Sequence, residues 1–112
     1  MERTATINID DIVYREDLYP RFEVDQKLIE KYAESIDFLP PVIVNQNNIL
    51  IDGYHRWKAH QLSGEKQIKV IVKETKSEAE LEILAYKYNS IHGKQLSKQE
   101  KMSFAQKKIG LL

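Results

Sequence analysis

A strand-like run, a glycine and a helix-like run with several basic side chains follow one another in residues 49–59. His55, Arg56 and Lys58 fall in the first turns of the predicted helix, directly after Gly53. The first N–H groups of a helix have no partner within the helix, and its dipole favours negative charge at that end. Glycine lets the backbone come close to a ligand, and arginine can donate two parallel hydrogen bonds to a phosphate. This junction therefore predicts an anion site suited to phosphates.

The same residues also have an interpretation without a ligand. Gly53 then provides only a tight turn, His55 is a satisfied polar side chain, and Arg56 pairs with a carboxylate. Asp52 is the carboxylate that adjoins the motif and is a candidate general base, although it can simply cap the following helix. Trp57 is expected in the core rather than as a stacking platform.

Several other chemistries are excluded by residue type. The chain has no cysteine, which removes disulfides, thiolate zinc sites and cysteine nucleophiles. It has no phosphate-loop glycine pattern and no His-Glu-x-x-His pair, and His60 and His92 are far apart in sequence. No apolar run approaches the length of a membrane span, and the first 25 residues are too charged for a signal peptide. We therefore expect one soluble cytoplasmic domain over residues 1–112.

The charge is balanced in total but not along the chain. Residues 1–85 carry 11 Lys and Arg against 16 Asp and Glu, whereas residues 86–112 carry 6 Lys against Glu100 alone. Such asymmetry can mark an end that faces nucleic acid, and it can equally be a solvated helix face. The candidate lysines of this DNA or partner face are Lys94, Lys98, Lys101, Lys107 and Lys108.

The hydrophobic pattern of the chain predicts about four short strands and about four helices. Alternating or β-branched runs indicate strands near residues 5–9, 42–44, 49–51 and 68–72, with a hairpin turn at residues 45–48. Helices are expected over residues 25–36 and 54–62, and after capping boxes formed by Ser77 with Glu80 and by Ser97 with Glu100. The fold class is therefore α+β, a small mixed sheet flanked by helices.

Motifs in a fixed order carry a family resemblance. Tyr19-Pro20-Arg21, Pro41–Val44, Asp52–Ala59 and Asn89–Ser97 resemble, in this order, the boxes of the ParB/sulfiredoxin superfamily. Within it, the chain is most similar to the ParB-like N-terminal (ParB-like nuclease) domain. The resemblance covers nearly the whole chain and implies the ParB/sulfiredoxin-like fold.

In that family the boxes line a nucleotide pocket with magnesium between the phosphates. The resemblance implies that Asn89 approaches the metal. It also implies a nucleotide or phosphate site made of Arg21, Gly53, Tyr54, His55, Arg56 and His92. Full-length relatives continue into a helix-turn-helix domain, so residues 1–90 are expected to form the nucleotide-binding core. Residues 91–112 are then a basic helical segment that leads toward DNA-binding parts.

The motifs depart from the family pattern at three positions. Tyr54 stands where one form of the motif has an acidic residue, and His55 replaces an arginine of that form. Tyr88 stands where partition proteins carry the glutamate that supports hydrolysis, which argues against efficient turnover. The sulfiredoxin branch uses a cysteine before His-Arg, and Tyr54 excludes that chemistry here.

The function expected from this resemblance is a CTP- or ATP-binding, magnesium-dependent regulatory domain. It would belong to a ParB-like DNA-binding protein of DNA partition or transcription regulation, forming a homodimer and associated with the nucleoid. An enzyme of the same fold, a small phosphotransferase or a nuclease, is the alternative. A third interpretation is a binding module without any ligand, whose lysine-rich end docks a protein.

Overall fold

The computed structural model describes residues 2–19 and 23–91, and within these it has the expected α+β class. The strands are β1 (Glu2–Asn8), β2 (Val42–Val44), β3 (Leu50–Asp52) and β4 (Gln67–Lys73). The α-helices are α1 (Gln26–Ala33), α2 (Tyr54–Leu62) and α3 (Glu78–Ile91). Three 3-10 turns connect them, η1 (Ile9–Asp11), η2 (Glu16–Leu18) and η3 (Ile36–Phe38). The fourth expected helix, after Ser97, lies outside the described residues.

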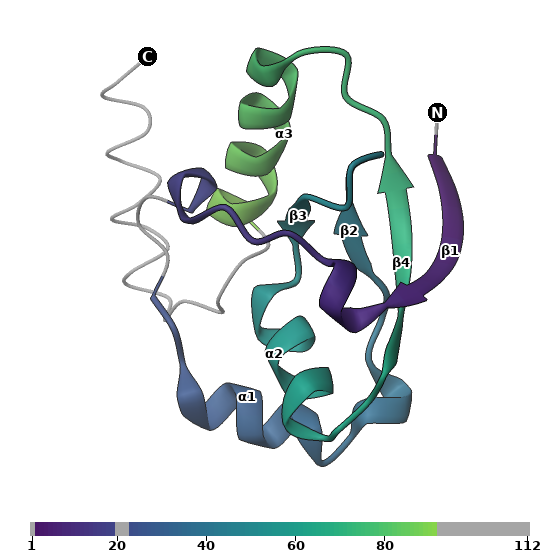
Figure 1. Cartoon of the computed structure of the whole chain (residues 1–112). Helices are drawn as coiled ribbons and strands as arrows, with labels where there is room; N and C mark the ends of the chain where they lie inside the picture. Colours follow the sequence, from purple (N-terminus) through teal and green to yellow (C-terminus); the bar gives the residue numbers. More distant parts are fainter. Residues whose placement is uncertain (1, 20–22, 92–112) are drawn as a thin grey trace.

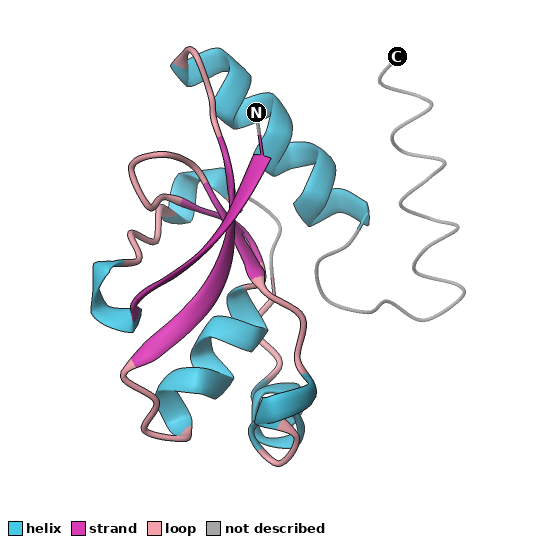
Figure 2. Cartoon of the chain, turned by 90° about the vertical axis from the view of Figure 1, so that its right-hand side faces the viewer, coloured by secondary structure: helices cyan, strands magenta, loops and turns pink. Residues whose placement is uncertain are grey.

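The four strands form one mixed sheet in the order β1-β4-β2-β3. β1 is antiparallel to β4, β4 is parallel to β2, and β2 and β3 form the antiparallel hairpin that the sequence predicts. The long strands β1 and β4 run together along the twisted sheet (Figure 2). The parallel step from β2 to β4 requires a crossover, and α2 provides it. Helix α2 is therefore fixed to the sheet at both its ends.

The core lies between the sheet and the helices. All three residues of β2 are buried, and β4 alternates, with Ile68, Val70 and Val72 turned inward. This alternation is the pattern of a strand with one solvated face. In Figure 1, α3 lies above α2 beside the sheet and α1 crosses beneath α2. Among the described residues, no helix has the length and apolar character needed to cross a membrane.

Helix α1 begins where the sequence indicates but ends earlier. Asp25 is its N-cap, and its side chain accepts a hydrogen bond from the backbone N–H of Leu28. The helix was expected to continue to Ile36, but it ends at Ala33. The N–H groups of Glu34 and of the next residue bond three positions back rather than four, which tightens the last turn and stops the helix. η3 then restarts the chain in a new direction.

Both ends of α2 and the start of α3 lie where the sequence predicts them. Gly64 follows the end of α2 with φ of +75°, the left-handed conformation that glycine adopts most readily. At α3 the hydroxyl of Ser77 accepts a hydrogen bond from the backbone N–H of Glu80, the first half of the predicted capping box. These caps fix the end of α2 and the start of α3 relative to the sheet.

Candidate functional site

The junction between β3 and α2 depends on Gly53. Its backbone has φ of +107° and ψ of 30°, and it is the N-cap residue of α2. A Cβ at this position would lie 2.6 Å from Cγ1 of Val42 in the neighbouring strand. Glycine is therefore required both by the backbone conformation and by the packing of the turn on β2. The first N–H to bond within the helix is that of Trp57, which donates to the carbonyl of Gly53 at 2.8 Å.

This junction forms one wall of a cavity of about 430 Å³, a size within the ~300–1,000 Å³ range of small-molecule pockets. The cavity is bounded by four segments of the chain. They are α1 with Leu28 and Tyr32, the stretch before β2 with Leu39 and Pro40, the junction with Asp52 to Arg56, and α3 with Tyr88. The start of α2, which carries the positive end of the helix dipole, therefore borders a cavity whose lining also includes apolar side chains.

Arg56 lies in the wall of this cavity and is paired there with Asp52. One guanidinium nitrogen (Nη2) lies 3.3 Å from Oδ2 of Asp52, and their side chains are only 17% and 9% exposed. The same nitrogen comes within 2.9 Å of the place where a Gly53 Cβ would stand, so the guanidinium folds back over the glycine. The sequence allows Asp52 to cap the helix, but the N-cap residue is Gly53, and the Asp52 carboxylate contacts Arg56.

His55 lines the cavity and also connects α2 to α1. Its Nε2 accepts a hydrogen bond from the backbone N–H of Asp25 at 3.0 Å, and the residue is 5% exposed. An accepting Nε2 carries no proton, so a neutral His55 carries its proton on Nδ1. Because Asp25 is the N-cap of α1, the imidazole fixes the position of the residue that begins α1.

Tyr19 and Asn89, the latter near the end of α3, form a hydrogen-bonded pair beside the junction. The hydroxyl of Tyr19 donates to the carbonyl of Leu50 at 2.7 Å, and Nδ2 of Asn89 donates to the carbonyl of Leu18 at 3.3 Å. Burial and the negative charge of Asp52 raise the pKa of Tyr19, whereas a hydrogen bond with Asn89 lowers it. Tyr19 therefore keeps its proton at neutral pH, and it interacts with both Asn89 and Asp52.

The buried side-chain oxygen of Asn89 is a donor of the kind that magnesium accepts. Oδ1 of Asn89 is buried and has no hydrogen-bond partner among the described residues. No group of three or more His, Cys, Asp or Glu side chains that could hold a metal occurs in the described part of the chain. Mg²⁺ binds hard oxygen ligands and is commonly held by one or two protein groups together with phosphates. Asn89 and Asp52 provide oxygen donors of that kind.

The structure brings most of the predicted site residues together, and two predicted members lie outside the described residues. Asp52, Gly53, Tyr54, His55 and Arg56 all line the cavity, and Asn89 lies close by through Tyr19. Arg21 and His92 lie outside the described residues, as do the candidate lysines Lys94, Lys98, Lys101, Lys107 and Lys108.

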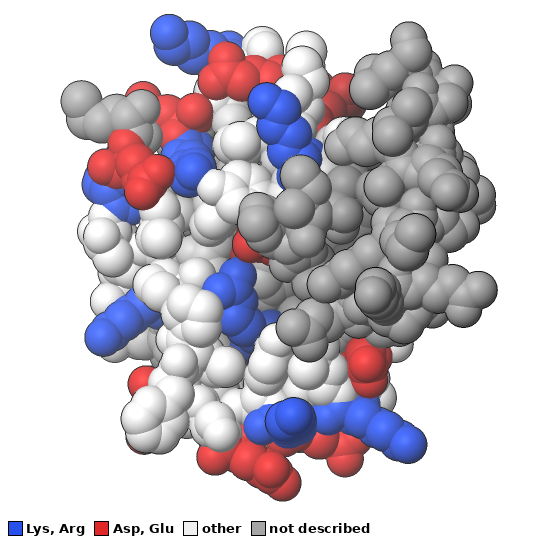
Figure 3. All heavy atoms as spheres, turned by 180° about the vertical axis from the view of Figure 1, so that it is seen from behind, with Lys and Arg blue, Asp and Glu red and all other residues white. Residues whose placement is uncertain are grey.

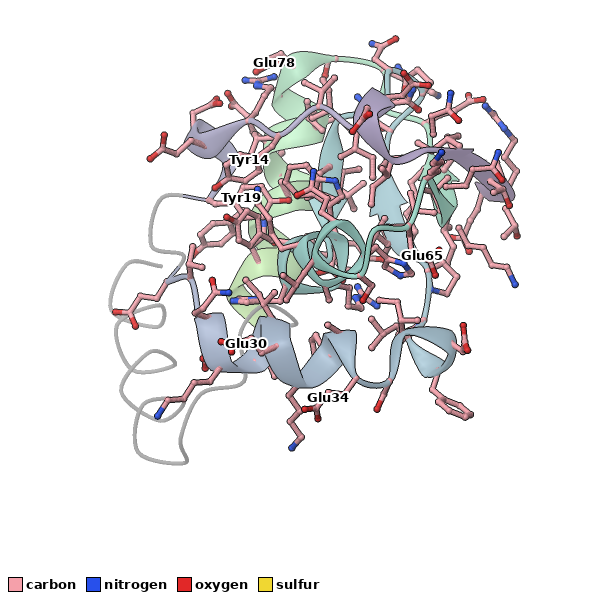
Figure 4. The ribbon with its side chains drawn as sticks, turned by 60° about the horizontal axis from the view of Figure 1, so that its bottom comes forward. Tyr14, Tyr19, Glu30, Glu34, Glu65 and Glu78 are labelled. Atoms are coloured by element: carbon pink, nitrogen blue, oxygen red, sulfur yellow. The ribbon has the colours of Figure 1, made fainter. Side chains whose placement is uncertain are left out.

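An aromatic cluster beside the cavity was not predicted from the sequence. Tyr14 lies 5.2 Å from Tyr19 and 5.0 Å from Tyr54 between ring centroids, and Figure 4 shows Tyr14 and Tyr19 side by side. Trp57 joins the cluster and is 7% exposed, so it belongs to the core as expected. The ammonium of Lys58 lies 4.6 Å from the Trp57 ring centroid, which is a cation–π contact. The signal that could have predicted this cluster is the spacing of Tyr54 and Trp57, which places them on one face of the helix.

Comparison with known structures identifies the fold. The domain is similar to a Pnob8-like ParB-N domain, with a TM-score of 0.72 at 22% identity over 96% of this chain and 44% of that chain. It is similar to the C-terminally truncated chromosome-partitioning protein ParB from Caulobacter crescentus complexed with CTP-γ-S, with a TM-score of 0.66 at 18% identity over 94% of this chain and 61% of that chain. The complex of that protein with the centromeric parS site gives a TM-score of 0.67 at 18% identity, over 91% and 55% of the two chains.

Sulfiredoxin from Arabidopsis thaliana shares the fold more distantly, with a TM-score of 0.55 at 20% identity over 65% of this chain and 86% of that chain. The chain spans less than two thirds of the ParB structures that it matches. The comparison with curated proteins finds no match. The family model described as the ParB N-terminal domain matches residues 1–90. With this match over most of its 112 residues, the chain belongs to the ParB N-terminal domain family.

Proposed function

We propose that this domain binds a nucleoside triphosphate, CTP or ATP, together with Mg²⁺, and so regulates a ParB-like DNA-binding protein of DNA partition or transcription control. The observation that carries the proposal is the cavity of about 430 Å³ whose wall is the start of α2, from Gly53 to Arg56. A helix N-terminus and an arginine in the wall are suited to phosphate, and the apolar side chains of the lining are suited to a base.

The residues of the pocket would divide the binding between them. Arg56 would donate to phosphate oxygens, and the start of α2 would add its positive partial charge. Leu28 and Pro40 offer an apolar surface to the base. Asn89 and Asp52 supply oxygen donors of the kind that Mg²⁺ prefers, and this ion reduces the negative charge of the phosphates when it is bound.

The relatives support both parts of the proposal. One ParB of this fold is complexed with CTP-γ-S, and its parS complex contains centromeric DNA. By this likeness, residues 1–90 are the nucleotide-binding core, and residues 91–112 lead toward parts that meet DNA or a second copy of the chain. On the face seen in Figure 3, the Lys and Arg side chains are interspersed with Asp and Glu side chains. Because residues 86–112 carry 6 Lys against one Glu, we assign the DNA contacts to the lysines of residues 94–108, which would bind phosphates without reading sequence.

Calorimetric titration with CTP and with ATP, each with MgCl₂, tests the nucleotide part. Arg56→Ala should lower the affinity at least tenfold, because a charge-assisted bidentate contact is lost. Arg3→Ala is the matched control, since the Arg3 side chain is 60% exposed on β1 and does not line the cavity. Absence of binding by the wild-type domain, or equal affinity of Arg56→Ala and the wild type, would contradict the proposal.

A further inference from the structure

Among the described residues, Arg56 is the arginine that lines the cavity, and a carboxylate of the same wall holds it. Arg56 and Asp52 are 3.3 Å apart, one helical turn from each other in sequence, and both are largely buried. The pair places a positive and a negative group side by side at the start of α2, so the two side chains together carry no net charge. A phosphate that binds Arg56 must therefore approach a buried carboxylate as well.

The two partners differ in their freedom to move. Asp52 is the last residue of β3, its backbone is paired with Ile43 of β2, and the residue is only 6% exposed. Arg56 lies on the first turns of α2 and reaches the carboxylate through a long side chain with several rotatable bonds. A rearrangement of the pair is therefore a movement of the guanidinium, while the carboxylate keeps its place in the wall.

We propose that Asp52 is an internal competitor for the phosphate-binding guanidinium: it occupies Arg56 in the empty pocket, and an incoming phosphate must take Arg56 from it. The inference rests on the proposed nucleotide site and adds a residue that determines its affinity. The remaining carboxylate repels the bound phosphate, since like charges a few ångströms apart in a partly buried wall are poorly screened. The contact thus lowers the affinity of the pocket for weakly binding anions.

A purely structural role of Asp52 predicts the opposite effect of its removal. If the carboxylate only holds Arg56 in a productive position, its loss leaves the guanidinium less ordered and weakens binding. If it competes, its loss strengthens binding. An increase in affinity cannot come from damage to the fold, so its sign separates the two roles.

The experiment is a calorimetric titration of CTP into the wild type and Asp52→Asn, in EDTA and again with MgCl₂. Asp52→Asn should bind metal-free CTP about tenfold or more tightly than the wild type, because one repelling charge beside the phosphates is gone. Asp10→Asn is the control for net charge, since Asp10 is exposed on η1 away from the cavity. Circular dichroism establishes that each variant is folded.

Equal or weaker metal-free binding by folded Asp52→Asn would overturn the inference and leave the nucleotide site intact. No binding by the wild type in either condition would overturn both. Nuclear magnetic resonance of the wild type provides a measurement that does not need the variant to fold. The Arg56 side-chain N–H and the Asp52 side-chain carbon should shift together when CTP is added; a shift of Arg56 with an unchanged Asp52 signal would also overturn the inference.

Discussion

At the scale of single residues, Gly53 is the position at which the junction tolerates least change. Alanine there would have to adopt φ of +107° and would place its Cβ 2.6 Å from Val42. The left-handed backbone costs about 1–2 kcal/mol and the overlap a further 1–3 kcal/mol, so Gly53→Ala should lower the free energy of unfolding by about 2–5 kcal/mol. Urea denaturation measures this loss.

Gly64→Ala is the control for this prediction. Gly64 also has a positive φ, +75°, but a Cβ added there meets nothing within 4 Å. Gly64→Ala should therefore lower the free energy of unfolding only by the cost of the left-handed backbone, about 1–2 kcal/mol. Equal losses in the two variants would show that the contact with Val42 does not matter.

Residue types alone identified the side of the pocket that carries charge. Gly53, His55 and Arg56 stood out because glycine followed by basic residues at a helix start is electrostatically unusual. The apolar walls could not be found in this way, because Leu28 and Tyr88 resemble ordinary core positions of their helices and meet only in the folded chain. The pairing of Asp52 with Arg56 was open, since a carboxylate before a helix can cap it or bridge to its first turn equally well.

At the scale of elements, the β2–β3 hairpin is organised by Asn45. Its side-chain oxygen accepts hydrogen bonds from the N–H groups of Asn47 and Ile49, at 2.9 and 3.0 Å, and its amide donates to Thr75. The residue is 2% exposed, so its removal leaves buried groups unpaired. Asn45→Ala should therefore lower the free energy of unfolding by about 2–3 kcal/mol.

Thermal or urea unfolding checks the hairpin prediction against Asn47→Ala. The Asn47 side chain is exposed, and the change there should stay within about 0.5 kcal/mol. A similar effect of both substitutions would mean that the turn is set by backbone preference and not by the Asn45 side chain.

A surface ion-pair network joins η2 to α3 and makes stability depend on pH. Arg15 bonds to Asp17 and to Glu78, the first residue of α3, and these contacts lower the pKa of both carboxyls below their ordinary values of 3.8 and 4.5. Because the folded pKa values are the lower ones, the stabilisation is complete above the ordinary values and is lost as the pH falls through the lowered ones.

The pH dependence of the melting temperature, measured for the wild type and Arg15→Met, tests this network. The wild type should melt higher at pH 6 and 0.05 M salt, and the difference should shrink below about pH 4 and in 1 M salt, where the exposed pairs are screened. A difference that is independent of pH would assign the effect of Arg15 to packing of its side-chain stem.

The elements themselves could mostly be predicted from the sequence, and what was missed has physical causes of two kinds, local and long-range. Capping residues and glycines fixed the bounds of α2 and the start of α3, because those signals act within a few residues. The predicted end of α1 was wrong because Tyr32 and Ile36 share the helix face that periodicity detects. The tightened last turn does not alter that pattern. The crossover that puts β4 between β1 and β2 comes from long-range pairing, which local patterns do not encode.

At the scale of the whole molecule, two stretches of the chain differ in the sign of their net charge. The part up to residue 85 is net acidic, whereas residues 86–112 carry 6 Lys against one Glu. A phosphate-bearing small ligand can be bound by one arginine inside a pocket, but a DNA backbone needs several exposed cations whose counterions are released on binding. The proposed nucleotide and DNA contacts therefore belong to different stretches of the chain.

This separation predicts how DNA binding responds to salt. If Lys107 and Lys108 contact phosphates, the double change Lys107→Gln and Lys108→Gln should weaken DNA binding equally on all sequences. It should also reduce the slope of log affinity against log salt by about 1.8, that is about 0.9 for each contact. The same change at Lys27 and Lys31, both exposed on α1, is the control and should leave the slope unaltered. Fluorescence anisotropy with labelled duplexes measures both. An equal fall in slope for the two variants would mean that only net charge matters, and no detectable binding by the wild type would remove DNA contact from residues 91–112.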